Sequence, residues 1–150
     1  MKLLIASDHA GYALKERLIP FLIGLGHEVK DAGSYVFLAT DDFPDFMIPV
    51  AKEVSEYPEQ TRAILIGGSG QGEAMLANRF KNVRAAVYYA PNLDIVKLSR
   101  DHNNANVLCL GARFLHETEA KDAVQFWLET PFSKDERHVR RLKKIDDLSL

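Results

Sequence analysis

Short apolar runs alternate with longer stretches of helical periodicity along this chain, and this alternation restricts the fold more than any other feature of the sequence. Residues 3–6 and 63–66 are uninterrupted apolar runs of strand length, typical of strands that are covered on both faces. Strands of this kind separated by helical crossovers predict a parallel sheet between two helical layers. We therefore predict one α/β domain over residues 1–150, a three-layer α/β/α sandwich with a five-stranded, parallel, Rossmann-like sheet and a C-terminal helix.

The same periodicities predict where each element lies. Strands are expected at residues 3–6, 27–29, 63–66, 85–89 and 106–111. Helices are expected at residues 10–25, from Phe46 to just before Pro58, and at 73–80, 91–101, 117–128 and 134–148. Residues 34–42 are expected to form a loop. In the last helix an apolar residue recurs every third position, which predicts a buried stripe of Val139, Leu142, Ile145 and Leu148.

Composition and charge exclude several classes of protein. A chain with 47% hydrophobic and 27% charged residues is not a disordered one, and a net charge of −2 argues against nucleic acid or an anionic membrane as a partner. The first apolar run reaches Asp8 too soon to be a signal peptide or a membrane span, so a cytoplasmic protein is expected. Cys109, the one cysteine, lies in an apolar strand and is expected to be buried.

Ligands of a parallel sheet gather beyond the carboxyl ends of its strands. The candidate site segments are therefore residues 7–11, 32–42, 67–73, 88–91 and 111–114. The glycine-rich turn at residues 67–72 is the clearest of them, because a turn between a strand and a helix aims several backbone N–H groups at one point and favours an anion. The turn is not a P-loop, since no Lys-Ser/Thr pair follows Gly72. Taken alone, it is equally well explained as a tight turn with glycines at positive φ.

Other candidates have structural explanations when each is taken alone. Asp8 suits the cap of the first helix, and His102 suits the C-terminal end of another. Glu73 suits a first helical turn, where the dipole lowers a carboxyl pKa, so that a role as base requires burial to raise it. Arg137 and Arg141 share a helical face and fit a phosphate, but they also fit a solvated charged surface. No histidine pair at zinc spacing appears, so no metal is expected.

Four segments occur in a fixed order over nearly the whole chain. They are Ser-Asp-His-Ala-Gly at 7–11, Gly-Gly-Ser-Gly-Gln-Gly-Glu at 67–73 with Ala-Asn at 77–78, His-Asn-Asn-Ala-Asn-Val at 102–107 and Arg-His-Val-Arg-Arg at 137–141. Together they closely resemble the ribose-5-phosphate isomerase B family, the RpiB/LacAB sugar-phosphate isomerases. The resemblance implies an aldose–ketose isomerase that interconverts D-ribose 5-phosphate and D-ribulose 5-phosphate through a cis-enediolate, without metal or organic cofactor. It also implies a homodimer or a dimer of dimers with shared active sites.

The chain departs from many members of this family at the position of the base. Those members carry a cysteine directly before the Gly-Ser/Thr-Gly turn, where this chain has Gly67. A second branch uses a glutamate directly after the turn, and Glu73 matches it. The resemblance therefore implies Glu73 as the catalytic base.

The resemblance also implies roles for the other motif residues. Ser69 and the turn residues Gly68, Gly70, Gln71 and Gly72 would contact the substrate and stabilise the enediolate oxygen. His102 would open the sugar ring with Asp8 as partner on another sugar oxygen, and Asn103 would bind the open-chain hydroxyls, with His102 and Asn103 coming from the partner subunit. The phosphate would be held by His9, Arg113, Arg137 and Arg141. His138 and Arg140 are secondary candidates.

Three alternatives remain open at this point. In the first, the substrate is instead a six-carbon sugar phosphate (allose 6-phosphate or galactose 6-phosphate), whose far end would meet the loop at residues 35–45. A non-catalytic phosphosugar-binding module would use the same scaffold, but a carboxylate at Glu73 brings such a module no affinity for an anion. A flavodoxin-like or receiver-like signalling domain would leave the glycine turn unexplained.

Overall fold

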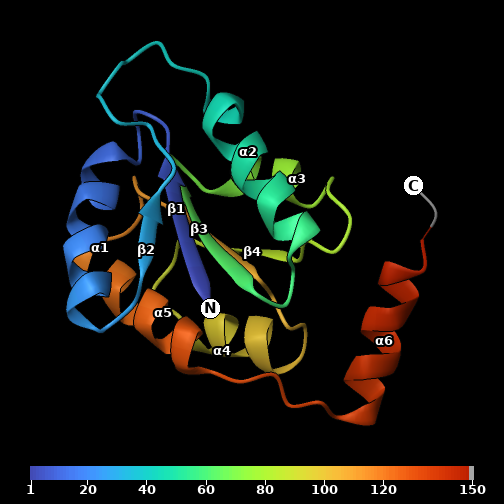
Figure 1. Cartoon of the computed structure of the whole chain (residues 1–150). Coiled ribbons are helices and arrows are strands. Elements are labelled where there is room, and N and C mark those ends of the chain that lie inside the picture. The colour runs from blue at the N-terminus through green and yellow to red at the C-terminus, as the bar shows by residue number, and fades with distance from the viewer. Residues whose placement is uncertain (149–150) are drawn as a thin grey trace.

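Five parallel strands form the central sheet of the computed structural model, which describes residues 1–148 (Figure 1). The sheet order is β2-β1-β3-β5-β4, and every neighbouring pair is parallel. The strands are β1 (Lys2–Ser7), β2 (Val29–Asp31), β3 (Thr61–Gly67), β4 (Ala85–Tyr88) and β5 (Val107–Gly111). The predicted fold class is confirmed.

Helices cover both faces of this sheet and create two cores. The covering helices are α1 (Tyr12–Gly24), α2 (Phe43–Glu56), α3 (Gln71–Ala77), α4 (Leu93–Asp101) and α5 (Glu117–Glu129), and α6 (Glu136–Asp146) follows them. Because successive side chains of a strand point to opposite faces, Leu3 and Ile5 pack with α1, α4 and α5, whereas Leu4 and Ala6 pack with α2 and α3. Trp127 of α5 is fully buried in the first core. No helix among the described residues combines the length and apolar character needed to cross a bilayer.

The starts of β2 and α3 differ from prediction in opposite directions. β2 begins at Val29 rather than at residue 27, because the N–H of His27 still bonds to the carbonyl of Leu22 (3.1 Å) after Gly26 has taken a φ of 91°. α3 begins at Gln71, inside the glycine turn, and ends at Ala77, three residues before the predicted end. The glycine turn is therefore shorter than expected.

Three other helix starts are set by local capping chemistry. α2 begins at Phe43 because Pro44 stands in its first turn, where proline costs no hydrogen bond. Pro91 lies before α4 rather than inside it, since Asn92 is the N-cap and its side chain accepts from the N–H of Asp94. Asp135 caps α6 in the same way by accepting from the N–H of Arg137, so this helix begins two residues later than predicted.

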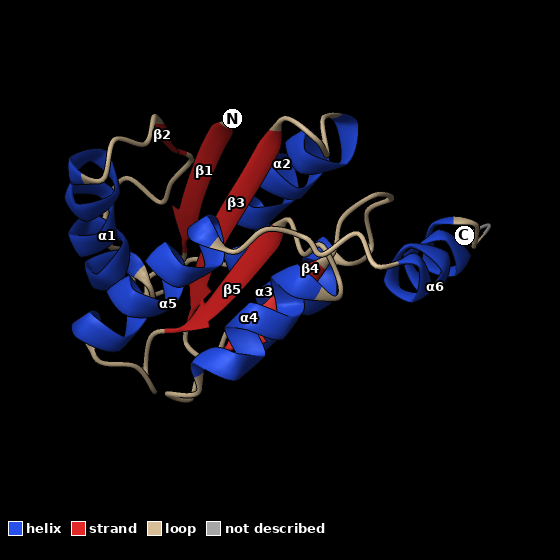
Figure 2. Cartoon of the chain, turned by 90° about the horizontal axis from the view of Figure 1, so that it is seen from below, coloured by secondary structure: helices blue, strands red, loops and turns tan. Residues whose placement is uncertain are grey.

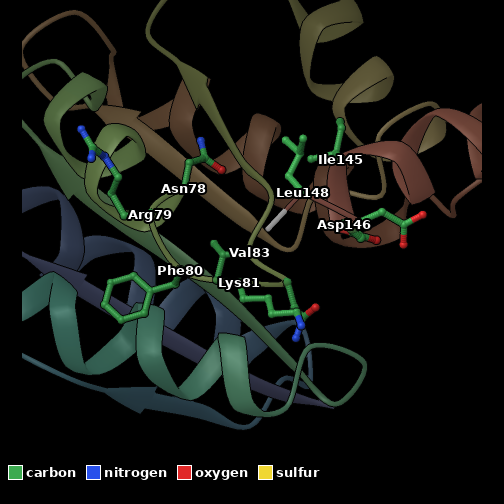
Figure 3. A pocket seen from close by; sticks show the side chains of 10 residues that line it. Asn78, Arg79, Phe80, Lys81, Val83, Ile145, Asp146 and Leu148 are labelled. Carbon is green, nitrogen blue, oxygen red and sulfur yellow. The ribbon is translucent and has the colours of Figure 1, made fainter. Parts of the chain in front are cut away.

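The C-terminal helix stands away from the rest of the domain (Figures 1 and 2). Its predicted buried stripe is wrong for this chain alone: Leu142 is 8% exposed, but Val139, Ile145 and Leu148 are 46–61% exposed. The reason is the segment that links α5 to α6, which carries the helix outward and leaves a cavity of about 400 Å³ between α6 and residues 78–83. Figure 3 shows Ile145 and Leu148 across this cavity from Asn78 and Val83.

Candidate active site beyond β1 and β3

The strand order places a crevice beside β1. The chain passes from β1 to β2 on one side of it and to β3 on the other, and ligands of such sheets bind beyond the carboxyl ends of the strands where the order reverses. Ser7 pairs with Ile66, so Asp8 and Gly67 emerge side by side. A cavity of about 350 Å³ lies at this edge, lined by Asp8, Phe43, Gly68, Ser69, Gly72, Glu73, Arg113 and Phe114. Six of these residues were singled out from the sequence.

The glycine turn packs closely against β5 because Gly70 has no side chain. Gly70 has a φ of 77°, the left-handed region that favours glycine. A Cβ atom at Gly70 would also lie 3.0 Å from the carbonyl carbon of Leu110 in β5. Inside the turn, the N–H of Gln71 donates weakly to the Ser69 hydroxyl at 3.4 Å. The turn therefore presents Ser69 and its backbone to the cavity from a fixed position.

Glu73 lies in the first turn of α3 and is 4% exposed. Its carboxylate folds back over the Cα atom of Gly67. Burial raises the pKa of Glu73 above its ordinary value, the charge of Asp8 acts in the same direction, and a backbone hydrogen bond opposes both. The site thus supplies the burial that a base at this helix start requires, and a carboxyl group with a raised pKa is a better proton acceptor near neutral pH.

Asp8 has two structural tasks at the end of β1. Its Oδ1 accepts from the N–H groups of Ala10 (2.9 Å) and Gly11 (3.2 Å), which holds the loop before α1. The residue is 7% exposed and lines the cavity together with Glu73. The N-cap of α1 is Gly11, so Asp8 supports the loop without being the cap itself.

His9 contacts a residue that sequence reasoning did not identify. Its Nδ1 lies 2.6 Å from Oδ1 of Asp41, and its backbone N–H donates to the same oxygen at 3.1 Å. Asp8, His9 and Asp41 are the one group of metal-ligand residue types gathered within residues 1–148, and the hydrogen bond of His9 to Asp41 accounts for the grouping without an ion. No spacing rule points to Asp41, because it is 32 residues from His9 in an irregular loop.

Arg113 supplies positive charge at the cavity. It lies just beyond β5, where its backbone N–H donates to the carbonyl of Gly68 at 3.1 Å. Its guanidinium crosses Gly68, so that a Cβ atom there would lie 3.0 Å from Nη1. Asp8, Glu73 and Arg113 therefore line the same cavity.

The remaining predicted site residues form a second group elsewhere in the chain. His102 and Asn103 follow α4 and precede β5, which places them at the amino edge of the sheet, opposite the cavity. The ring of His102 lies 4.1 Å from that of the buried His138 of α6, so the third and fourth motifs meet. Arg137 and Arg141 are exposed on α6. Within one chain, the structure does not bring this group to Glu73.

Cys109 is buried in β5, as predicted. Burial raises the pKa of its thiol well above the ordinary value, and the charge of Glu73 adds to that effect. The residue does not line the cavity. A thiol in this state is not a nucleophile or a base.

Comparison with known proteins places this geometry among sugar-phosphate isomerases. Residues 3–145 match the family described as Ribose/Galactose Isomerase. The chain is 38% identical over 142 residues to ribose-5-phosphate isomerase B of Mycobacterium tuberculosis (strain H37Rv), covering 95% of this chain and 86% of that one. It is 40% identical over 141 residues to a probable ribose-5-phosphate isomerase B of Mycoplasma genitalium, covering 94% and 91%.

Solved structures give the same result. The crystal structure of ribose-5-phosphate isomerase B from Mycoplasma genitalium with bound ribulose-5-phosphate superposes with a TM-score of 0.92 at 39% identity, covering 97% of this chain and 93% of that one. The isomerase from Clostridium thermocellum superposes with a TM-score of 0.90 at 39% identity, covering 98% and 96%.

Proposed function

The chain belongs to the ribose/galactose isomerase family, and from that membership and its site we propose that it interconverts D-ribose 5-phosphate and D-ribulose 5-phosphate. The relatives named ribose-5-phosphate isomerase B support this substrate, as does the ribulose-5-phosphate in the Mycoplasma genitalium structure. The observation that carries the proposal is the buried carboxyl group of Glu73, with its raised pKa, in a cavity that also holds Asp8 and Arg113.

The chemistry assigned to the cavity is a proton transfer between neighbouring carbons. Glu73 removes the proton from C2 of the open-chain aldose, the electron pair moves to the carbonyl oxygen, and a cis-enediolate forms. The proton of the C2 hydroxyl passes to the oxygen on C1, the electron pair left on the C2 oxygen forms the new carbonyl, and the protonated Glu73 returns its proton to C1, which yields the ketose. Ser69 and the backbone of the glycine turn stabilise the negative oxygen, a preorganised effect whose loss costs about 10²–10³ in rate for one donor. Asp8 contacts another sugar oxygen.

We further propose that the second group of motif residues completes this site from a partner subunit in a homodimer. His102 then opens the sugar ring, Asn103 binds its hydroxyls, and Arg137 and Arg141 hold the phosphate together with His9 and Arg113. The separation of the two groups within one chain supports this arrangement. The exposed apolar residues of α6 support it too, because a partner would bury them.

Mixing two inactive subunits tests the shared site. Glu73→Gln and His102→Ala lie in different groups, so a mixed dimer has one site with both defects and one site with neither. Random mixing of the two variants then restores about a quarter of the wild-type sites in a symmetric dimer. A mixture as inactive as its components would contradict the shared site.

The isomerase activity itself is tested with purified protein on ribose 5-phosphate in the presence of EDTA, with allose 6-phosphate and galactose 6-phosphate in parallel. We expect turnover on ribose 5-phosphate and incorporation of solvent hydrogen into the product. The Glu73→Gln variant should lose about 10²–10⁴ in kcat with little change in KM. Glu117→Gln is the matched control, because Glu117 stands in the first turn of α5 but is exposed. If the protein binds the substrate but exchanges no hydrogen between substrate and solvent, it is a phosphosugar-binding module instead.

A further inference from the structure

The side chain of Asp41 forms hydrogen bonds with both the ring and the backbone of His9. One oxygen, Oδ1, accepts from the ring Nδ1 (2.6 Å) and from the backbone N–H of His9 (3.1 Å). The hydrogen bonds join the end of β1 to the loop before α2, two segments that meet at the rim of the active-site crevice. The two bonds fix both the backbone and the imidazole ring of His9.

The side chain of Asp41 is almost completely buried, although the residue lies in a loop. Its side chain is 6% exposed, against 27% for that of His9. Its second oxygen, Oδ2, is buried and has no hydrogen-bond partner within residues 1–148. Burial of a carboxylate is costly unless a positive or donating group compensates it. His9 is the group that provides this compensation.

The contact determines which nitrogen of His9 is left for a ligand. With Nδ1 donating to Asp41, Nε2 is the ring nitrogen that remains, and the hydrogen bond of one nitrogen sets the role of the other. The edge of Phe37 contacts the His9 ring (centroids 6.4 Å apart) and restricts its rotation further. In the ring form that carries protons on both nitrogens, Nδ1 donates to Asp41 and Nε2 donates to an anion, and the carboxylate of Asp41 balances the positive charge of the ring.

From these contacts we propose that Asp41 is a positioning residue, which holds His9 with Nε2 toward the substrate phosphate and offsets the charge of its ring. The proposal rests on the proposed function, in which His9 binds that phosphate. Asp41 itself does not touch the substrate. Its contribution therefore concerns the affinity for a phosphate group and passes entirely through His9.

Two substitutions separate the contribution of the negative charge of Asp41 from that of its oxygen acceptor. Asp41→Asn keeps the size and an oxygen acceptor but removes the negative charge, whereas Asp41→Ala removes both. Asp42→Asn is the matched control, since it changes the neighbouring carboxylate, which is exposed and makes no side-chain cap contact. Each protein is compared by KM and kcat for ribose 5-phosphate and, by calorimetry, by the Kd of inorganic phosphate.

We expect Asp41→Ala to raise KM and the Kd of phosphate by about tenfold or more, the usual size of a charge-assisted hydrogen bond, with kcat changed less than about threefold. Asp41→Asn should fall between Asp41→Ala and wild type, and Asp42→Asn should match wild type. In a His9→Ala background, Asp41→Asn should have no further effect. Wild-type KM and Kd in Asp41→Ala would overturn the proposal, as would an undiminished effect of Asp41→Asn without His9, because Asp41 would then act through the loop.

The phosphate measurement separates this proposal from the proposed isomerase activity. If wild type binds phosphate through His9 and Asp41 but turns over no sugar phosphate, the isomerase assignment fails and the role of Asp41 is supported. If wild type isomerises ribose 5-phosphate with no dependence on Asp41, the role of Asp41 fails and the isomerase assignment stands.

Discussion

The carboxylate of Glu73 occupies the space that a side chain at residue 67 would fill. A Cβ atom at Gly67 would lie 2.6 Å from Oε2 of Glu73 and would overlap Oε1. The family resemblance implies a cysteine base at this position in many members of the family. A side chain at position 67 and the observed placement of Glu73 therefore exclude each other, because the Glu73 carboxylate lies over a residue without a side chain.

Gly67→Ala should consequently damage catalysis without removing any reacting group. The added methyl displaces the Glu73 carboxylate, and a misplacement on the order of 1 Å costs about 10²-fold in rate. We expect kcat to fall by that factor while KM stays near wild type. Gly24→Ala is the control, because a Cβ atom at Gly24 meets nothing within 4 Å. Full activity in Gly67→Ala would contradict the assignment of Glu73 as the base.

The burial of Glu73 should also reduce stability at neutral pH. Since burial raises its pKa above the ordinary 4.5, the folded protein binds more protons than the unfolded chain between the two pKa values. The stabilisation from the protonated form is complete below pH 4.5 and is lost as the pH rises through the folded-state pKa. The Glu73→Gln variant does not titrate, so we expect it to have a higher Tm than wild type near pH 8.

Calorimetric melting across this pH range checks the expectation. The advantage of Glu73→Gln should shrink as the pH falls through the folded-state pKa of Glu73 and be absent below the ordinary glutamate value of 4.5. Glu117→Gln should show no advantage at any pH, because Lys121 lowers the pKa of Glu117 and the charged form is the favoured one. Equal Tm values for wild type and Glu73→Gln near pH 8 would mean that the buried carboxyl is fully compensated.

The arginines of α6 should contribute to substrate affinity rather than to the chemical step. Arg137→Ala or Arg141→Ala removes a charge-assisted hydrogen bond to the phosphate, so KM should rise by about tenfold or more with a smaller change in kcat. Lys144→Ala removes a cation from the last turn of the same helix and serves as control. Steady-state kinetics on ribose 5-phosphate measure all three variants. A wild-type KM in Arg141→Ala would refute the phosphate clamp.

The apolar face of α6 should be needed for subunit association. Ile145 is 56% exposed in the single chain, and Ile145→Asp places a charge where the proposed partner would pack. We expect this variant to shift from dimer to monomer in analytical ultracentrifugation and to lose activity while its helical content is retained. Lys144→Asp changes the neighbouring, already polar position and should remain a dimer. If the wild-type protein is a monomer in solution, a site shared between two subunits cannot form.

Local patterns predicted those parts of the fold that depend on short-range chemistry. The apolar run of β3 and the glycine turn after it led directly to the correct fold and to the cavity edge, because both signals lie within a few consecutive residues. The position of Asp41 beside His9 was not predictable in this way, since it results from how the loop before α2 returns to β1. The exposure of Ile145 was also missed, because a periodic stripe indicates burial without saying which surface provides it.

The burial of Cys109 has a consequence for the conditions in which such an enzyme works. Peroxide and alkylating reagents inactivate proteins by reacting with accessible thiolates, and the one sulfhydryl of this chain is enclosed within the sheet. A carboxylate has no comparable oxidation chemistry. Turnover should therefore continue in hydrogen peroxide or iodoacetamide at doses that silence a thiolate-dependent relative, with no reductant required to restore it.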